Sequence, residues 1–186
     1  MKTLNPTLWR TCRVLAGKTR IKLLRQLHDH PGQNVSELAM SVGIGRSDAS
    51  QELRRLQSRG LLQAEQNGSH LLYRMAADPQ VLSATPLLKA LKAAFASYPP
   101  ERDEEICSIA TGLAYPRRIA LAKALLETPQ TELALQISLN LSSFATFTHL
   151  RILMNSGFVR RDKHLLRFEP LAHPLAGELV RLCRTC

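Results

Sequence analysis

Aromatic residues and long hydrophobic runs are what this sequence lacks. Phe, Trp and Tyr make up 5% of its 186 residues, so we expect a core of aliphatic side chains, as helical bundles usually have. No apolar run approaches the roughly 20 residues that a membrane-spanning helix needs. Arg10 and Arg13 interrupt the first 17 residues, which argues against a secretory signal. These absences predict a cytoplasmic protein without a membrane partner.

The sequence signatures of common enzyme classes are missing as well. There is no phosphate-binding loop, no glycine-rich dinucleotide turn and no nucleophile elbow. The one acidic cluster, residues 101–105, is placed to complement the positive N-terminal end of a helix. We therefore expect that the protein is not an enzyme and that it uses no cofactor.

Cysteine is scarce, with four residues in the chain. In a cytoplasmic protein these are expected to be reduced thiols. Cys12 and Cys107 occupy matching places in two similar segments, which suits small core residues. Cys183 and Cys186 have a spacing compatible with a metal, but two thiolates are fewer than the four ligands of tetrahedral zinc. We therefore expect no metal site, and Cys183 and Cys186 are only weak candidates for metal ligands.

Positive charge, by contrast, is in excess. The chain has 25 Lys and Arg against 15 Asp and Glu, a net charge of +10. Basic side chains displace counterions from phosphates, so this balance favours a nucleic-acid partner. Divided at Pro79, the first part has 12 basic against 6 acidic residues and the remainder has 13 against 9. By this division the excess is more concentrated in the first part.

The chain also resembles itself at an offset of 95 to 98 residues. The matching pairs include residues 12–17 with 107–112, 19–27 with 117–125, and 36–44 with 131–139. Several such matches in one order, with little drift in offset, indicate a duplication. We therefore expect two domains, residues 1–97 and residues 98–186.

Each copy predicts the same order of elements. In copy one, apolar periodicity and capping signals predict four helices, then a hairpin around Asn67-Gly68-Ser69, then a helix capped by Thr85. The first helix opens at Asn5 and Pro6 and runs to about residue 17, the second lies near residues 18–28, and the fourth is expected at residues 47–59. The third is a short helix around Leu38 that is capped by either Asn34 or Ser36. This is the order of a winged helix, in which two short helices brace a third that fits a DNA major groove. The expected fold is mainly α with small β-hairpins, an α+β arrangement of tandem winged helix-turn-helix domains.

A family pattern becomes specific within residues 36–75. Its residues are Glu37, Leu38, Ala39, Ser47, Ser50, Gln51, Leu53, Leu56, Gly60, Leu61 and Tyr73. Residues 6–97 thereby resemble the ArsR-type winged-helix repressors, and the remainder does so only through the internal repeat. The resemblance implies a DNA-binding transcriptional repressor. One metal-sensing class of this family has a cysteine pair on the supporting helix, where this chain has Met40 and no cysteine.

The helix expected at Ser47–Arg59 is the candidate DNA-recognition helix. With Ala49, Leu53 and Leu56 inward, a polar face is left outward, and the resemblance implies contact with DNA at the same positions. Gln pairs well with adenine and Arg with guanine, while a Ser at a helix N-terminus suits a phosphate. The expected DNA contacts are Arg46, Ser47, Ser50, Gln51, Arg54 and Arg55. Glu52 stands where family members often have His or Asn, and a merely solvated polar face is the alternative interpretation.

The second copy predicts a different surface. Aligned on the buried leucines and Gly60/Gly157, Phe144 and Phe147 replace Ser47 and Ser50. Exposed aromatic side chains form an apolar patch that favours a partner. A shift in register would instead give the polar role to Ser142, Ser143 and Thr146. Auxiliary DNA contacts in this copy are expected at Thr148, Arg151, Arg160, Arg161 and Lys163, and a solvated hairpin is the alternative for the last three.

Three interpretations of the second copy stay open. Both copies contact duplex DNA, so that one chain forms an intramolecular pseudo-dimer. Alternatively, the first copy reads DNA while the second serves homodimerisation or effector binding, which we favour. In the third interpretation neither copy reads DNA, and the protein is a winged-helix scaffold for protein–protein interaction.

Overall fold

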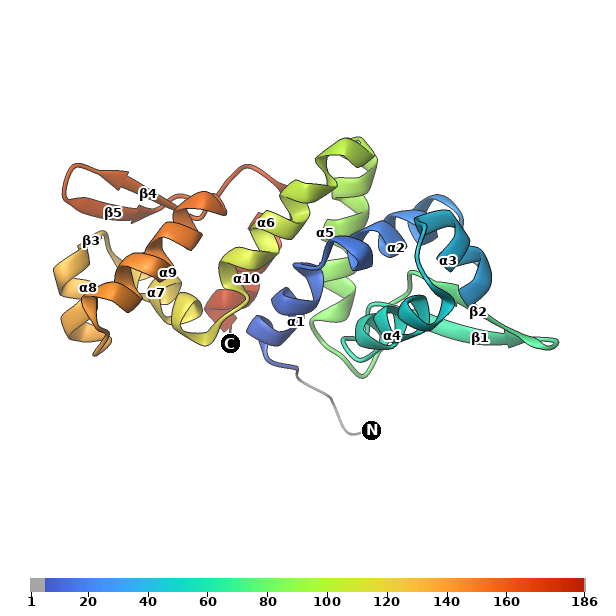
Figure 1. The fold of residues 1–186 in the computed structure, drawn as a ribbon. Helices are drawn as coiled ribbons and strands as arrows, with labels where there is room; N and C mark the ends of the chain where they lie inside the picture. Colours follow the sequence, from blue (N-terminus) through green and yellow to red (C-terminus); the bar gives the residue numbers. More distant parts are fainter. Residues whose placement is uncertain (1–5, 186) are drawn as a thin grey trace. The chain divides into compact units, whose positions relative to one another are not determined.

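The computed structural model describes residues 6–185, which form two compact units (Figure 1). Residues 17–104 belong to the first unit, and residues 7–16 and 105–185 belong to the second. The two units meet between residues 104 and 105, seven residues after the domain boundary that we predict at 97/98, and the first helix of the chain lies in the second unit. Asn5 and Cys186 lie outside the described residues.

The first unit consists of helices with one antiparallel hairpin. Its elements are α2 (Lys18–Asp29), α3 (Val35–Val42), α4 (Arg46–Gln57), β1 (Gln63–Asn67), β2 (His70–Arg74), α5 (Ala84–Ser97) and the 3-10 turn η1 (Pro100–Arg102). In the hairpin Ala64 pairs with Tyr73, and the turn falls at Gly68-Ser69 as expected. The core is aliphatic, with Ile21, Leu24, Leu27, Leu38, Leu53, Leu56, Leu87 and Leu91 buried. The expected order of elements from residue 18 onward is thus present.

Two helices of this unit begin earlier than expected. Gly45 is the N-cap of α4, so Ser47 is its second residue rather than its cap. Helix α5 begins at Ala84, because the Ala84 amide donates to the carbonyl of Val81 (2.9 Å) and the chain turns before Thr85. At the start of α3, by contrast, Asn34 forms a complete capping box with Glu37, which settles the choice between Asn34 and Ser36.

The second unit has the same order of helices and hairpin. Its elements are α1 (Leu8–Leu15), α6 (Asp103–Leu113, of which the first two residues belong to the first unit), α7 (Pro116–Glu127), β3 (Gln130–Thr131), α8 (Glu132–Ser138), α9 (Ser143–Asn155), β4 (Val159–Asp162), β5 (Leu165–Phe168) and α10 (Pro174–Thr185). Strand β5 lies between β3 and β4 in an antiparallel sheet. The chain is therefore mainly helical with small antiparallel hairpins, as predicted.

The sequence match between residues 36–44 and 131–139 is shifted relative to the structural match between α3 and α8. The sequence paired Leu38 with Leu133, but Leu133 is exposed. Leu38 and Leu135 are both fully buried, and each is the fourth residue of its helix, α3 and α8 respectively. Leu135 is therefore the structural counterpart of Leu38, because the two helices match by the position that faces the core. Similarity between the neighbouring residues in the sequence does not fix this register.

The linker after α5 is held to the first unit by a buried arginine. Arg25 of α2 donates to both carboxylate oxygens of Asp103 (2.5 and 3.2 Å), to the carbonyl of Phe95 (2.7 Å) and to that of Tyr98 (3.0 Å). Its guanidinium also lies 4.5 Å from the centre of the Phe95 ring. Asp103 therefore has a specific partner, beyond the helix-dipole role that the sequence indicated for the acidic cluster, and the first unit extends to residue 104.

Within residues 6–185, no helix is both long enough and apolar enough to cross a membrane.

Candidate nucleic-acid interface

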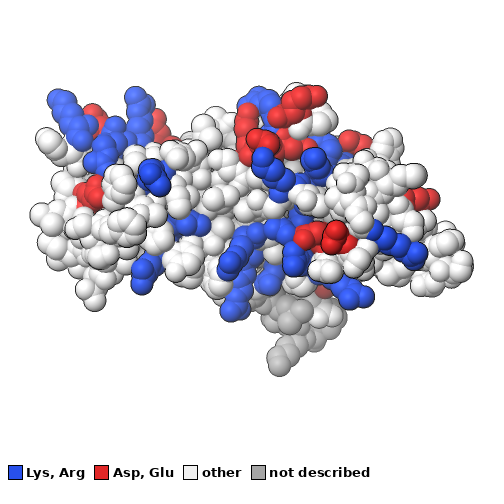
Figure 2. Space-filling model, in the orientation of Figure 1, with Lys and Arg blue, Asp and Glu red and all other residues white. Residues whose placement is uncertain are grey.

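Helix α4 presents a polar face to solvent, and the buried residues on its inner side determine which residues lie on that face. Ala49, Leu53 and Leu56 are fully buried on its inner side. Of the predicted DNA contacts, Arg46, Ser47, Gln51, Arg54 and Arg55 are exposed and Ser50 is half-buried. Lys and Arg side chains gather over this part of the first unit, with a few acidic groups among them (Figure 2). The helix therefore offers amide and guanidinium donors on one rigid face, which is the chemistry that reads base edges in a major groove.

Glu52, the departure from the family pattern, is turned toward α2. It forms an ion pair with Arg20 of α2, in which both side chains are largely buried, and a second pair with Arg55 (2.5 Å). The carboxylate therefore attaches α4 to α2 and does not belong to the outward face. Arg55 is partly neutralised by this contact, so Arg54 is the stronger cation of the two toward a phosphate or a guanine. The one signal of this role in the sequence is an acidic residue in place of the usual polar one.

The base of the hairpin lies beside α4. Tyr73 of β2 is buried, and burial raises the pKa of its hydroxyl while the nearby positive charge of Arg54 opposes that shift. Its backbone amide donates to the carbonyl of Gln33 (2.8 Å), and its carbonyl accepts from the amide of Gly32 (3.0 Å). Backbone hydrogen bonds of Tyr73 thereby join the hairpin to the loop before α3, and its hydroxyl lies within the electrostatic influence of Arg54 on α4.

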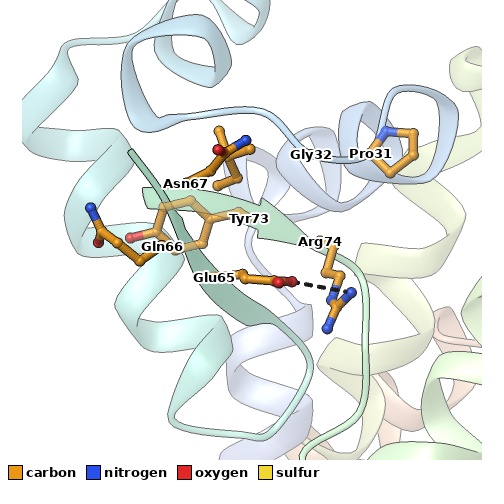
Figure 3. Close-up of a pocket in the computed structure, with 8 residues that line it drawn as sticks. Pro31, Gly32, Glu65, Gln66, Asn67, Tyr73 and Arg74 are labelled. Carbon is orange, nitrogen blue, oxygen red and sulfur yellow. Dashed lines mark ion pairs between the residues drawn. The ribbon is translucent and has the colours of Figure 1, made fainter. Parts of the chain in front are cut away.

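An open hollow lies between this loop and the hairpin (Figure 3). It has a volume of about 430 Å³, and its wall includes Pro31, Gly32 and Tyr73. Glu65 and Arg74 form an ion pair across it (3.4 Å). Among the described residues, no buried polar atom without a partner lies in its wall, so we assign it no ligand. The Glu65–Arg74 pair also leaves this hairpin with little free positive charge for DNA.

Helix α9 of the second unit presents aromatic residues at the corresponding positions. Thr146, Leu150 and Leu153 are fully buried, so the register is the one that exposes Phe144 and Phe147. Thr148 is half-buried, and the exposed Arg151 lies 5.8 Å from the centre of the Phe147 ring. Only Arg151 of the expected contacts on this helix is therefore fully presented to solvent.

The hairpin of the second unit carries the remaining auxiliary residues, all of them exposed. Arg160 pairs with Glu169 (3.4 Å) and Arg161 with Glu132 at the start of α8 (2.8 Å). Lys163 lies in the two-residue turn with a left-handed backbone (φ 51°). Lys163 thus lies at the tip of this hairpin, while the ion pairs of the two arginines brace it.

The charge excess is distributed differently between the structural units than between the two sequence segments. Counted over all 186 residues by unit, the first has 13 Lys and Arg against 9 Asp and Glu, and the second has 12 against 6. The second unit is therefore the more basic one. The count differs because helix α1 brings Arg10 and Arg13 to the second unit, while the acidic start of α6 belongs to the first.

At the position of Glu52, helix α9 has a histidine. His149 and Glu52 are both the seventh residue of their helices, and Arg118 and Arg20 are both the third residue of α7 and α2. His149 stacks on Tyr115 (5.2 Å between ring centres), and its Nδ1 is buried without a hydrogen-bond partner among the described residues. Arg118 donates instead to the carbonyl of Gly112 (2.9 Å). Burial, with smaller contributions from Arg118 and Arg117, lowers the pKa of His149 below its ordinary value.

We expect this histidine to make the second unit less stable in mild acid. Because the folded-state pKa is the lower one, the unfolded chain binds the proton more readily, so stability falls as pH decreases below about 6.5 and levels off below the folded-state pKa. Urea unfolding followed by circular dichroism across this range should show the fall, and His149→Gln should remove that part of it. His164→Gln, on the exposed turn, is the matched histidine control. An unchanged pH slope in His149→Gln would contradict the assignment.

The cysteines do not assemble into a metal site in the described part of the chain. Cys12, Cys107 and Cys183 are buried, the first two as core residues, and Cys186 lies outside the described residues. His173, just before α10, accepts a hydrogen bond at Nδ1 from the amide of Leu175 (3.1 Å). No group of three or more potential ligands lies close together within residues 6–185.

Comparison with known proteins gives one match. Residues 18–69, which span α2 to the turn of the first hairpin, match the model of the MarR family. Proteins of this family are winged-helix DNA-binding transcriptional regulators and typically act as dimers. The match indicates a winged helix-turn-helix of a transcription regulator at these positions, and it is a match to the MarR model rather than to the ArsR type that the sequence pattern resembled. No curated protein and no solved structure matches the chain.

Proposed function

We propose that the protein is a cytoplasmic transcriptional repressor that reads duplex DNA through α4. The observation that carries the proposal is the exposed polar face of this helix, held in register by three fully buried residues. Gln51 and Arg54 would read base edges, while Arg46 and Ser47 at the helix N-terminus would contact phosphates. Ser50 and Arg55 would complete the interface. The MarR match over residues 18–69 supports the same class of protein, and the ArsR-like pattern agrees with it.

We further propose that the second unit is a divergent winged helix and that the domains follow the structural units rather than the boundary at residues 97/98. The matching order of elements supports this, as do the left-handed glycines that follow the two central helices, Gly60 (φ 70°) and Gly157 (φ 71°). Arg160 and Lys163 of its hairpin are placed for auxiliary contact with phosphates, together with Arg161. The functional form would be a homodimer or an intramolecular pseudo-dimer. The exposed aromatic residues of α9 favour a task for this unit other than base recognition.

Salt dependence tests the proposed function. The full chain should bind a duplex taken from the region upstream of its own gene, and affinity should fall by at least about 10-fold between about 50 and 200 mM salt, because bound cations release counterions from phosphates. Fluorescence anisotropy of a labelled duplex measures this, with an unrelated duplex of equal length as control. No binding of either duplex at low salt would contradict the proposal and favour a protein-binding scaffold.

A further inference from the structure

An apolar surface covers the outer side of helices α8 and α9 in the second unit. Leu133 and Ile137 of α8 are 64% and 74% exposed, and Phe144 and Phe147 of α9 are 80% and 51% exposed. The two helices are neighbours, and the Ser143 hydroxyl donates to the Gln136 side chain (3.2 Å) where they meet. These four residues, here called the α8–α9 face, place large exposed apolar side chains on two neighbouring helices, and grouped apolar side chains of this kind mark interaction surfaces.

The first unit shows that this surface is not a normal DNA-binding face. Counted from the start of each helix, Leu133, Phe144 and Phe147 take the positions of Ser36, Ser47 and Ser50. Hydroxyl groups near the N-termini of α3 and α4 suit phosphates, whereas large apolar groups there would remove water from a phosphate and return no hydrogen bond. Three hydrogen-bonding positions have thus become apolar together, which favours a protein partner over a nucleic acid.

The border of the α8–α9 face is basic. Arg151 lies against Phe147. Arg161 of the hairpin forms an ion pair with Glu132, which directly precedes Leu133. Lys163 and Arg167 are exposed on the same hairpin. Lys and Arg gather over the hairpin, while the surface over α8 is largely uncharged (Figure 2). Two copies of this face would bring like charges together, so an acidic partner of different sequence fits better than a second copy.

We propose that the α8–α9 face binds an acidic amphipathic helix of another protein. Apolar side chains of that helix would cover Phe144, Phe147, Leu133 and Ile137, and its carboxylates would pair with Arg151 and Lys163. The comparison with α3 and α4 rests on the proposed function, but every residue of the binding site belongs to the second unit, so peptide binding is tested independently of DNA recognition by α4.

Binding of designed peptides to the full chain tests the proposal. Three fluorescent peptides of equal length are needed: an amphipathic helix with a Leu/Phe stripe and Glu/Asp flanks, the same stripe with Lys flanks, and a scramble of the first. Anisotropy should show the acidic amphipathic peptide binding at least about 10-fold more tightly than either of the others. The double variant Phe144→Ser/Phe147→Ser should lose this binding by about 10-fold or more, whereas Phe144→Leu/Phe147→Leu should largely keep it.

Matched controls distinguish binding at this site from nonspecific apolar binding, from dimerisation and from DNA binding. Met40→Ser replaces an equally exposed apolar residue of the first unit, and it should leave peptide binding unchanged. Equal affinity for all three peptides, or none for any, would overturn the proposal. So would a concentration-dependent dimer that Phe144→Ser/Phe147→Ser abolishes in analytical ultracentrifugation, because a second copy would then cover the face. Loss of duplex binding in the same variant would assign the face to DNA.

Discussion

Replacing Gln51 and Arg54 together with alanine is expected to weaken binding of the cognate duplex by about 100-fold or more. Each side chain can make a bidentate contact with a base edge, and each such contact contributes about 1–3 kcal/mol of discrimination. Both are exposed on a helix whose inner side is fully buried, so the substitutions should leave the fold intact. Anisotropy titrations at one fixed salt concentration measure the loss, and circular dichroism checks the fold.

The matched control lies in the second unit. Thr148 and Arg151 occupy the same positions of α9, sixth and ninth, as Gln51 and Arg54 occupy in α4. Thr148→Ala/Arg151→Ala should weaken duplex binding far less, because Thr148 is half-buried and Arg151 lies against Phe147. Equal losses in the two double variants would favour a pseudo-dimer in which both units contact DNA. Full binding by Gln51→Ala/Arg54→Ala would contradict recognition through α4.

Substitution of Arg25 should cause a large loss of stability in the first unit. Arg25→Ala removes the donor to the Asp103 carboxylate and to two backbone carbonyls, and it leaves a largely buried charge without its partner. Breaking a buried pair in this way lowers the free energy of unfolding by about 3–5 kcal/mol. Urea denaturation monitored by circular dichroism should show the change.

Two further variants separate the ion pair from other effects. Lys22→Ala, on the exposed side of the same helix, should cost little and controls for helix propensity. The double variant Arg25→Met/Asp103→Leu removes both charges, so it should be less destabilised than Arg25→Ala. If the single and the double variant lost equal stability, packing against Phe95 rather than the ion pair would account for the effect.

The aromatic pair on α9 shows how far sequence reasoning could go. Aligning the two copies on their buried leucines predicted that Phe144 and Phe147 replace Ser47 and Ser50, and the structure places both phenylalanines outward. The alignment succeeded there because a four-residue spacing of buried side chains constrains a helix strongly. It failed for the segment around Leu133, where a Glu-Leu-Ala sequence coincided with a different place on the helix.

By itself, the sequence determined the elements from residue 18 onward, the inner face of α4 and the polar character of its outer face. These follow from local rules: apolar spacing, caps and turn residues act over a few positions of the chain. Only the tertiary structure decided that Glu52 pairs with Arg20, that Arg25 holds Asp103, and that helix α1 belongs to the second unit. Each of these contacts joins residues that lie tens of positions apart, and local pattern does not encode which distant partner satisfies a buried charge or covers an apolar helix face.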